Sequence, residues 1–299
     1  EPGYSYHLES NFDLMQPILS ILAETYENIG LPLRSIENEY GPGQVECTFD
    51  AQPAAQAADD FLLFRTATRQ VCRRHGYLAT FMCKPAIEGY CTNGWHLHQS
   101  LADSKTGQNL CMPEDTGDAL SPLAQSYMAG LLENANASAV FATPTVNGYR
   151  RFMPNSLAPD RAAWSHDHRG TMLRVLGGVG DPATRLENRI GEPAANPYLF
   201  IASQIAGGID GIERNAQPWD ADDAPYEADR PMLPTSLKDG LDALDGSTLF
   251  HQAFGDTFIN YYLKHAELNR FNAYVGDNGD QDAENGISHW EQNEYFDFF

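Results

Sequence analysis

Four separate segments of the chain carry residue types that bind divalent metal ions and phosphate groups. Carboxylates and imidazoles suit divalent cations, and arginines suit the negative charge of a nucleotide triphosphate. Each segment alone is a weak signal, but together they point to metal-assisted phosphoryl transfer. The segments are residues 39–46 with two glutamates, residues 94–100 with two histidines, the arginines Arg151, Arg169 and Arg174, and residues 185–189 with Glu187 and Arg189.

The histidine pair consists of His96 and His98, which are separated by one residue. If this segment is a strand, both imidazoles face the same side and can enter one cavity. Two alternatives stay open at this point. The pair can be ordinary surface or hydrogen-bonded histidines, or it can belong to a zinc hydrolase. A zinc site needs a third histidine or cysteine nearby, and none stands out.

The carboxylate pair consists of Glu39 and Glu46, which flank a Gly-Pro-Gly turn. Two glutamates favour Mg²⁺ or Mn²⁺ over zinc, although surface carboxylates are the alternative. Glu187 and Arg189 also alternate, so they share a face if they lie on a strand. The alternative for this second pair is an ion pair with a purely structural role.

Composition restricts the class of protein. The 299 residues are 42% hydrophobic and 11% aromatic, which is typical of a globular chain that can bury a sizeable core. The net charge of −22 argues against nucleic-acid partners and anionic membrane surfaces. No apolar run is long enough to span a bilayer, and no signal-peptide pattern occurs. Five cysteines without a CxxC pair favour a reducing, cytoplasmic location.

Hydrophobic periodicity predicts an α+β fold in which helices alternate irregularly with short, mostly antiparallel strands. Residues 34–49 alternate around the Gly-Pro-Gly turn and are expected to form two strands or one strand with a bend. An aromatic C-terminal stretch is expected to pack on the protein. The predicted helices cover residues 12–29, 54–76, 120–137, 197–214, 236–244 and 256–271. The predicted strand pairs are 77–84 with 95–101 and 172–179 with 185–190, and residues 276–286 are predicted as a loop.

These segments, in this order, resemble the catalytic domain of the glutamine synthetase family. The similarity runs from about residue 36 to the end of the sequence. It is carried by Glu-x-Gly-Pro-Gly-Gln-x-Glu at 39–46, Lys84-Pro85, Gly-Trp-His-Leu-His-Gln-Ser-Leu at 94–101, Asn-Gly-Tyr-Arg-Arg-Phe-Met-Pro at 147–154, His168-Arg169 with Arg174, Arg-Leu-Glu-Asn-Arg at 185–189, Ala-Ala-Asn-Pro-Tyr-Leu at 194–199 and Ala-Gly-Gly-Ile-Asp-Gly at 206–211.

The resemblance implies a metal site of two or more Mg²⁺ or Mn²⁺ ions. Glu39 and Glu46 are expected to share one ion, and His96 and Glu187 are expected to hold a second. All of these roles are carried over from the family's motifs onto the matching positions.

The resemblance also implies that ATP binds near His98, Ser100 and Arg174. The γ-phosphoryl group passes to the side-chain carboxylate of glutamate. Ammonia or an organic amine then attacks the acyl phosphate, which gives a γ-glutamyl amide.

The arginines receive separate roles from the same resemblance. Arg151 is expected to bind the carboxylate of the substrate. Arg169 and Arg174 are expected to neutralise the transferring phosphoryl group, and Arg189 is expected to contact the acyl group or phosphate.

Two departures from the family pattern bear on the amine. Leu157 stands where ammonia-using members place a glutamate that deprotonates ammonium and closes the site. Cys91-Thr92 stands where an Asn-Gly pair that binds glutamate is expected. An organic amine is therefore predicted as the acceptor, as in the γ-glutamyl-polyamine and related branches of the family.

The family fold is a curved, mostly antiparallel sheet surrounded by helices, and residues 1–299 are expected to form this catalytic domain without the small N-terminal β-grasp domain. The family's homo-oligomeric rings build each site between neighbouring subunits, so we expect a fragment with weak activity alone. The alternative is a non-catalytic family member with an assembly or regulatory role. Retention of Glu39, Glu46, His96, Glu187 and the arginines weighs against that alternative.

Overall fold

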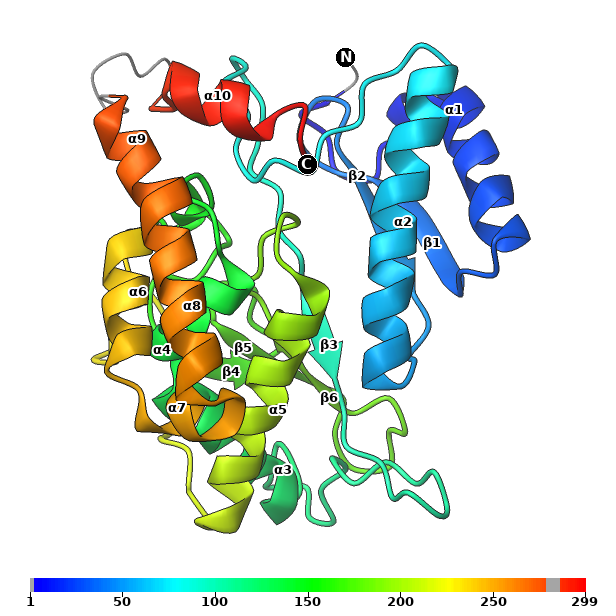
Figure 1. Cartoon of the computed structure of the whole chain (residues 1–299). Coiled ribbons are helices and arrows are strands. Elements are labelled where there is room, and N and C mark those ends of the chain that lie inside the picture. The colour runs from blue at the N-terminus through cyan, green and yellow to red at the C-terminus, as the bar shows by residue number, and fades with distance from the viewer. Residues whose placement is uncertain (1–2, 278–285) are drawn as a thin grey trace. The chain divides into compact units, whose positions relative to one another are not determined.

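The computed structural model describes residues 3–277 and 286–299 (Figure 1). The chain divides into two compact units. Unit 1 comprises residues up to 93 and from 278 onwards, and unit 2 comprises residues 94–277. Each unit has its own hydrophobic core.

Unit 1 combines a β-hairpin with helices, as the sequence predicts. The two strands are antiparallel, and their loop contains the Gly-Pro-Gly turn. Apolar side chains of the first helix, including Leu19 and Leu22, pack with Val71 of the second helix against the hairpin. The elements are α1 (Glu9–Asn28), β1 (Leu33–Asn38), β2 (Val45–Phe49), α2 (Ala54–Arg74) and α10 (His289–Tyr295).

The predicted buried strand at residues 77–84 is wrong, because this segment is irregular. Tyr77 and Leu78 are 50% and 56% exposed. The Phe81 amide donates to the Phe299 carbonyl of the C-terminal segment at 3.1 Å. Among the residues that the structure describes, no strand pairs with 77–84.

The aromatic C-terminal segment packs on unit 1, which confirms the prediction. Arg69 Nη1 donates to the Phe298 carbonyl at 2.6 Å, and Thr80 Oγ1 donates to the Phe296 carbonyl at 2.8 Å. The Arg65 guanidinium lies 5.8 Å from the centre of the Phe299 ring, a cation–π contact. Most of the predicted loop at 276–286 lies outside the described residues.

Unit 2 is built on a four-stranded sheet with the order β3-β6-β5-β4. β6 is antiparallel to both β3 and β5, whereas β4 is parallel to β5. The predicted pair at 172–179 and 185–190 is confirmed. The predicted strand at 95–101 forms β3, but its partner is β6. The strands are β3 (Leu97–Gln99), β4 (Trp164–His166), β5 (Leu173–Leu176) and β6 (Arg185–Asn188).

Helices supply the rest of unit 2, and Figure 1 shows α4, α6 and α8 lying close together. The predicted helix at 120–137 is divided into two at Asn134, whose side chain donates to the Gly130 carbonyl at 2.9 Å. The helical elements are α3 (Pro122–Glu133), α4 (Ala135–Ala142), the 3₁₀ turn η1 (Gly148–Arg151), α5 (Pro197–Glu213), α6 (Leu237–Asp245), α7 (Thr248–Phe254), α8 (Asp256–Ala266), the π-helical turn η2 (Glu267–Phe271) and α9 (Asn272–Gly276).

α3 and α5 pack closely because glycines remove side chains from their contact. A Cβ added at Gly211 of α5 would lie 2.1 Å from the Ser126 carbonyl oxygen of α3. A Cβ at Gly207, one turn earlier on α5, would meet its nearest atom at 3.5 Å, an ordinary contact. The packing of α3 against α5 therefore depends on Gly211 much more than on Gly207.

The architecture confirms the predicted α+β class, with mixed sheets and surrounding helices. Within residues 3–277 and 286–299, no helix combines the length and apolar composition needed to cross a bilayer.

The glycine contact gives a stability prediction. Gly211→Ala should lower the free energy of unfolding by about 1–3 kcal/mol, because the new methyl group overlaps backbone atoms of α3. Gly207→Ala is the matched control, and it should be neutral or stabilising by up to about 1 kcal/mol through helix propensity. Urea denaturation measures both values, and equal stability of the two variants would contradict the predicted packing.

Candidate active site

A row of ionisable side chains crosses one face of the unit 2 sheet. His98 on β3 lies opposite Glu187 on β6, and Glu187 lies opposite Arg174 on β5. Directly opposed residues share a face of the sheet. The neighbours of Glu187 on β6, Leu186 and Asn188, point to the other face and are buried. One face therefore packs into the core, and the opposite face carries charge.

The carboxylate of Glu187 is the centre of this cluster, and its side chain is only 2% exposed. Oε1 lies 2.5 Å from Arg189 Nη1, and Oε2 lies 3.1 Å from Arg174 Nη1. Oε1 also lies 3.3 Å from His96 Nδ1 and 3.8 Å from His98 Nε2. Predicted residues from three segments of the chain, 94–100, Arg174 and 185–189, therefore meet at one carboxylate. Glu187 and Arg189 form an ion pair, and its role is not fixed by this contact.

His96 lies between two guanidinium groups. Arg151 Nη2 is 3.3 Å from its Nε2, and Arg189 Nη1 is 3.4 Å from its Nδ1. Burial, followed by the charges of Arg189 and Arg151, holds the pKa of His96 well below its usual value. The ring is therefore neutral. We assign the proton to Nδ1, which faces Glu187, and the lone pair to Nε2, which faces Arg151.

His98 is neutral for similar reasons. Burial lowers its pKa to about 4, and the nearby Arg185 charge acts in the same direction, although Glu187 opposes the shift. Arg185 Nε donates to His98 Nδ1 at 2.9 Å, so the second nitrogen, Nε2, carries the proton on the side of Glu187.

The remaining arginines are fixed by backbone carbonyls. Arg151, at the end of η1, is 5% exposed and donates through Nη1 to the Arg189 carbonyl at 2.8 Å. Arg189 donates through Nε to the Arg169 carbonyl at 2.9 Å and through Nη2 to the Leu157 carbonyl at 3.2 Å. These bonds hold the guanidinium groups in position around the cluster.

Arg169 and Ser100 occupy exposed positions, Arg169 between β4 and β5 and Ser100 directly after β3. Arg169 contributes its carbonyl to Arg189. The predicted roles of both side chains rest on the resemblance alone.

Glu39 and Glu46 lie on the hairpin of unit 1. Glu46 on β2 is directly opposite Glu37 on β1, and the Glu39 amide donates to the Gln44 carbonyl at 2.9 Å. Since Glu37 and Glu39 alternate, Glu39 and Glu46 are diagonal neighbours on one face, within reach of long side chains. Their shared metal ion stays a prediction, and so does its relation to the unit 2 cluster.

Each predicted metal site offers two protein side chains. Among the described residues, no group of three or more histidine, cysteine, aspartate or glutamate side chains converges to hold an ion. Zinc sites use three or four protein ligands. Mg²⁺ commonly takes one or two carboxylates and completes its shell with phosphate and water oxygens. The pairs Glu39 with Glu46 and His96 with Glu187 are compatible with that pattern.

The sequence interpretation missed two members of the cluster. Asp167, directly after β4, accepts a hydrogen bond from Arg174 Nε at 3.0 Å, and Arg185 binds His98. Alternation of Arg185 with Glu187 and Arg189 along one strand was a signal for Arg185. No comparable signal marks Asp167, because β4 is three residues long.

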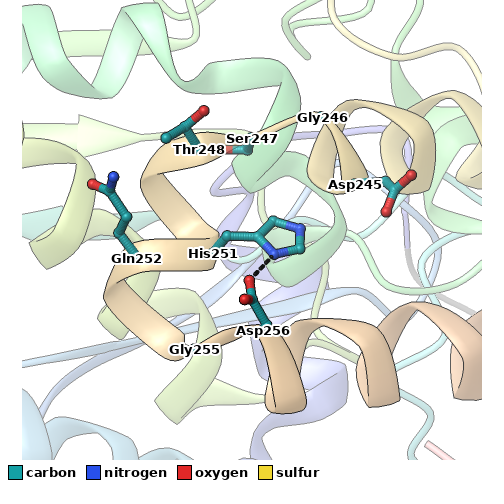
Figure 2. A pocket seen from close by; sticks show the side chains of 8 residues that line it. All are labelled: Asp245, Gly246, Ser247, Thr248, His251, Gln252, Gly255 and Asp256. Atoms are coloured by element: carbon teal, nitrogen blue, oxygen red, sulfur yellow. Dashed lines mark hydrogen bonds and ion pairs between the residues drawn. The ribbon is translucent and has the colours of Figure 1, made fainter.

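A separate cavity of about 550 Å³ lies between α6, α7 and α8 (Figure 2). His251 Nδ1 is 2.7 Å from Asp256 Oδ1 there, and His251 Nε2 is buried with no hydrogen-bond partner among residues 3–277 and 286–299. None of the predicted site residues lines this cavity. Because the unpartnered nitrogen is buried, the ring does not present it to the cavity.

Comparison with known proteins identifies relatives of the chain. Residues 2–280 match the family profile described as glutamine synthetase, catalytic domain. A γ-glutamylanilide synthase of an Acinetobacter species is 51% identical, over 98% of this chain and 59% of that protein. A γ-glutamylethanolamide synthetase of Streptomyces coelicolor is 34% identical, over 88% of this chain and 56% of that protein. A solved structure described as a GmaS/ADP complex superposes with a TM-score of 0.82 at 26% identity, over 98% of this chain and 66% of that one.

The chain spans 59% and 56% of the lengths of these two curated relatives. The profile match over residues 2–280 covers nearly all of the sequence. The chain therefore belongs to the glutamine synthetase family and carries its catalytic domain.

Proposed function

We propose that the chain is the catalytic part of an ATP-dependent ligase that joins the side-chain carboxylate of glutamate to an amine. The observation that carries this proposal is the convergence of His96, Arg174 and Arg189 on the buried carboxylate of Glu187, with Arg151 in contact with His96. The family and the two relatives named as γ-glutamyl amide synthases support the same reaction.

The reaction proceeds in two steps. A side-chain carboxylate oxygen of glutamate attacks the γ-phosphorus of ATP, and the bond to the bridging oxygen of ADP breaks. The amine nitrogen then attacks the carbonyl carbon of the acyl phosphate, loses a proton and expels inorganic phosphate. The products are a γ-glutamyl amide, ADP and phosphate.

The arginines bind and neutralise charge in this scheme. Arg151 binds the substrate carboxylate through its planar guanidinium. Arg169 and Arg174 neutralise the phosphoryl group during transfer, and Arg189 contacts the acyl or phosphate oxygens. Since Glu187 and backbone carbonyls hold Arg174 and Arg189 in place, little reorganisation is needed when negative charge develops.

Nucleotide and metal binding complete the site. His98, Ser100 and Arg174 lie on or beside the charged face and are proposed to contact ATP. The pairs Glu39 with Glu46 and His96 with Glu187 are proposed to bind two or more Mg²⁺ or Mn²⁺ ions. When bound, these ions neutralise phosphate charge as Lewis acids.

The loop that carries Leu157 supports an organic acceptor. Leu157 has φ of 59° and Asn155 has φ of 60°, a left-handed conformation that is costly for a leucine. Arg189 Nη2 binds the Leu157 carbonyl, and the Tyr226 hydroxyl donates to the Ala158 carbonyl at 3.0 Å. These bonds offset the strain and leave the Leu157 side chain 61% exposed. The loop therefore presents an apolar group where ammonia-using members have a carboxylate.

An apolar group at this position favours an uncharged amine. Ammonia and alkylamines carry a proton at neutral pH and need a base or an anionic site to bind and react. An aromatic amine is neutral, because the nitrogen lone pair is delocalised into the ring, and its ring can contact a leucine. The Acinetobacter relative is named for an anilide, the amide of aniline. We therefore propose a primary aromatic amine as the preferred acceptor.

The wider setting of the enzyme is also a proposal. Residues 1–299 are proposed to act as a catalytic domain within a homo-oligomeric ring, by analogy with the family. A reducing, cytoplasmic location is proposed because all five cysteines are free thiols. The non-catalytic alternative gains no support, since the relatives reported above are named as synthases or synthetases.

A panel of acceptors tests the proposed function. Aniline, substituted anilines, ethanolamine and ammonia are compared by ATP-dependent phosphate release and mass spectrometry of the products. Aromatic amines should give the highest kcat/KM. Ammonia above every amine would reverse the acceptor assignment, and the absence of Mg²⁺-dependent phosphate release would reject the ligase.

The phosphoryl role of Arg174 predicts a large loss of turnover. Arg174→Gln should lower kcat by about 10²–10³-fold, because it removes a positive charge that stabilises the transition state. The matched control is Arg214→Gln, which removes an exposed arginine paired with Asp210 on the surface of α5. That variant should keep wild-type activity. A wild-type kcat for Arg174→Gln, with folding checked by circular dichroism, would exclude the role.

The acceptor preference should respond to charge at position 157. Leu157→Glu should raise kcat/KM for ammonia relative to aniline, because the new carboxylate attracts ammonium and accepts its proton. Leu157→Gln has a similar size without the charge and should not favour ammonia. The ratio of the two kcat/KM values is the measurement. An unchanged ratio in Leu157→Glu would mean that this side chain does not face the amine.

A further inference from the structure

A second buried carboxylate lies outside the Glu187 cluster. Glu192 follows β6 by four residues and is 1% exposed. Its Oε1 accepts from the Thr145 amide at 2.8 Å, and its Oε2 accepts from the Thr145 hydroxyl at 2.8 Å. Both carboxylate oxygens are therefore bonded to a single residue, and none of the roles proposed above uses Glu192.

Thr145 lies in the segment that leads into η1. Its hydroxyl oxygen also accepts from the amide of Gly148, the first residue of η1, at 3.0 Å. A Cβ at Gly148 would lie 2.7 Å from Glu192 Cδ, so this backbone packs directly on the carboxyl group. A chain of bonds therefore runs from Glu192 through Thr145 into the turn whose last residue is Arg151.

The other end of this arrangement is the Arg151 guanidinium. Arg151 Nη1 donates to the carbonyl of Arg189, three residues before Glu192. The Glu192 amide also donates to the Ala142 carbonyl at 3.0 Å, and Thr143 Oγ1 donates to the Ile190 carbonyl at 2.9 Å. These hydrogen bonds join the segments 189–192 and 142–151 into one frame. Arg151 forms the contact at one end of the frame, and Glu192 forms the contacts at the other.

A carboxyl group at this buried position carries a desolvation cost in free energy. Burial raises the pKa of Glu192 to about 7, while the two bonds from Thr145 act in the opposite direction. The charged groups that favour its ionised form are Arg270 and Arg151, and the buried hydroxyls of Tyr149 and Tyr262 lie near it. Arg270 Nη1 also donates to the Pro144 carbonyl at 2.9 Å. An apolar residue would avoid the desolvation cost, but it would leave both Thr145 donors unpaired.

We propose that Glu192 is a positioning residue for Arg151. Through Thr145 it fixes the turn that carries Arg151 and so sets the place of the guanidinium that binds the substrate carboxylate. This inference rests on the proposed function for the identity of the substrate. The hydrogen-bonded frame itself does not depend on that function.

Two matched pairs of variants test the inference. Thr145→Val removes the hydroxyl at nearly constant volume, whereas Thr145→Ser keeps it. Glu192→Met removes both acceptor oxygens, whereas Glu192→Gln keeps one. Thr145→Val and Glu192→Met should raise KM for glutamate by about 10–100-fold and leave KM for ATP unchanged. Thr145→Ser should behave as wild type, and Glu192→Gln should be intermediate. Equal changes in both KM values would indicate a general structural role and would overturn the proposal.

A double-mutant cycle tests whether the effect acts through Arg151. Arg151→Lys should raise KM for glutamate by itself, because the planar guanidinium is lost. Adding Thr145→Val to Arg151→Lys should then cause little further change, since the group being positioned is absent. If the fold-increases in KM for glutamate of the two single variants multiplied in the double variant, the Glu192–Thr145 pair would act elsewhere. The inference would then be wrong.

Hydrogen exchange separates failure of this inference from failure of the proposed function. The amides of Arg150 and Phe152 are bonded within the turn, to the Asn147 and Tyr149 carbonyls. They should exchange at least tenfold faster in Thr145→Val and Glu192→Met than in wild type, and Thr145→Ser should match wild type. Unchanged exchange would overturn the positioning role whether or not the enzyme turns over. A wild-type protein that neither binds glutamate by calorimetry nor releases phosphate would instead reject the proposed function.

Discussion

The side chain of Glu187 is held almost out of water, and the charged face of the unit 2 sheet is organised around it. A buried carboxylate costs several kcal/mol unless opposite charges and hydrogen bonds compensate. Arg189 and Arg174 supply these on its two oxygens, while the neutral rings of His96 and His98 lie beside it. Removing this carboxylate would take a counter-charge from both guanidinium groups, and Arg174 would keep Asp167 as a partner.

This local balance contrasts with the chain as a whole, which has a net charge of −22. Around Glu187, the guanidinium groups of Arg151, Arg174, Arg185 and Arg189 outnumber the carboxylates of Glu187 and Asp167. Both histidines are neutral, because burial lowers the pKa of each. The result is a local excess of positive charge, which a polyphosphate needs if it is to bind an acidic protein.

Packing on the opposite face of the sheet keeps this cluster in register. Leu186 and Asn188 alternate with Glu187, and Asn188 donates to Gln204 of α5 at 2.6 Å. A shift of one residue in β6 would move Glu187 into the core and Leu186 into the charged cluster. The glycine-lined contact with α3 holds α5 in place. The hydrogen bonds around Glu192 hold the segment that carries Arg151.

The sequence by itself determined the features that depend on local patterning. The helices α1 and α2, the hairpin around the Gly-Pro-Gly turn and the β5–β6 pair follow from hydrophobic periodicity and from glycine at the turns. The motifs also named His96, Glu187, Arg151, Arg174 and Arg189. Tertiary structure decided what each segment pairs with. Residues 77–84 have strand-like composition but pair with no strand among the residues that the structure describes, and Glu192 gains its partner Thr145 from 47 residues earlier in the chain. Their free energies depend on residues far away in the chain, which local sequence does not encode.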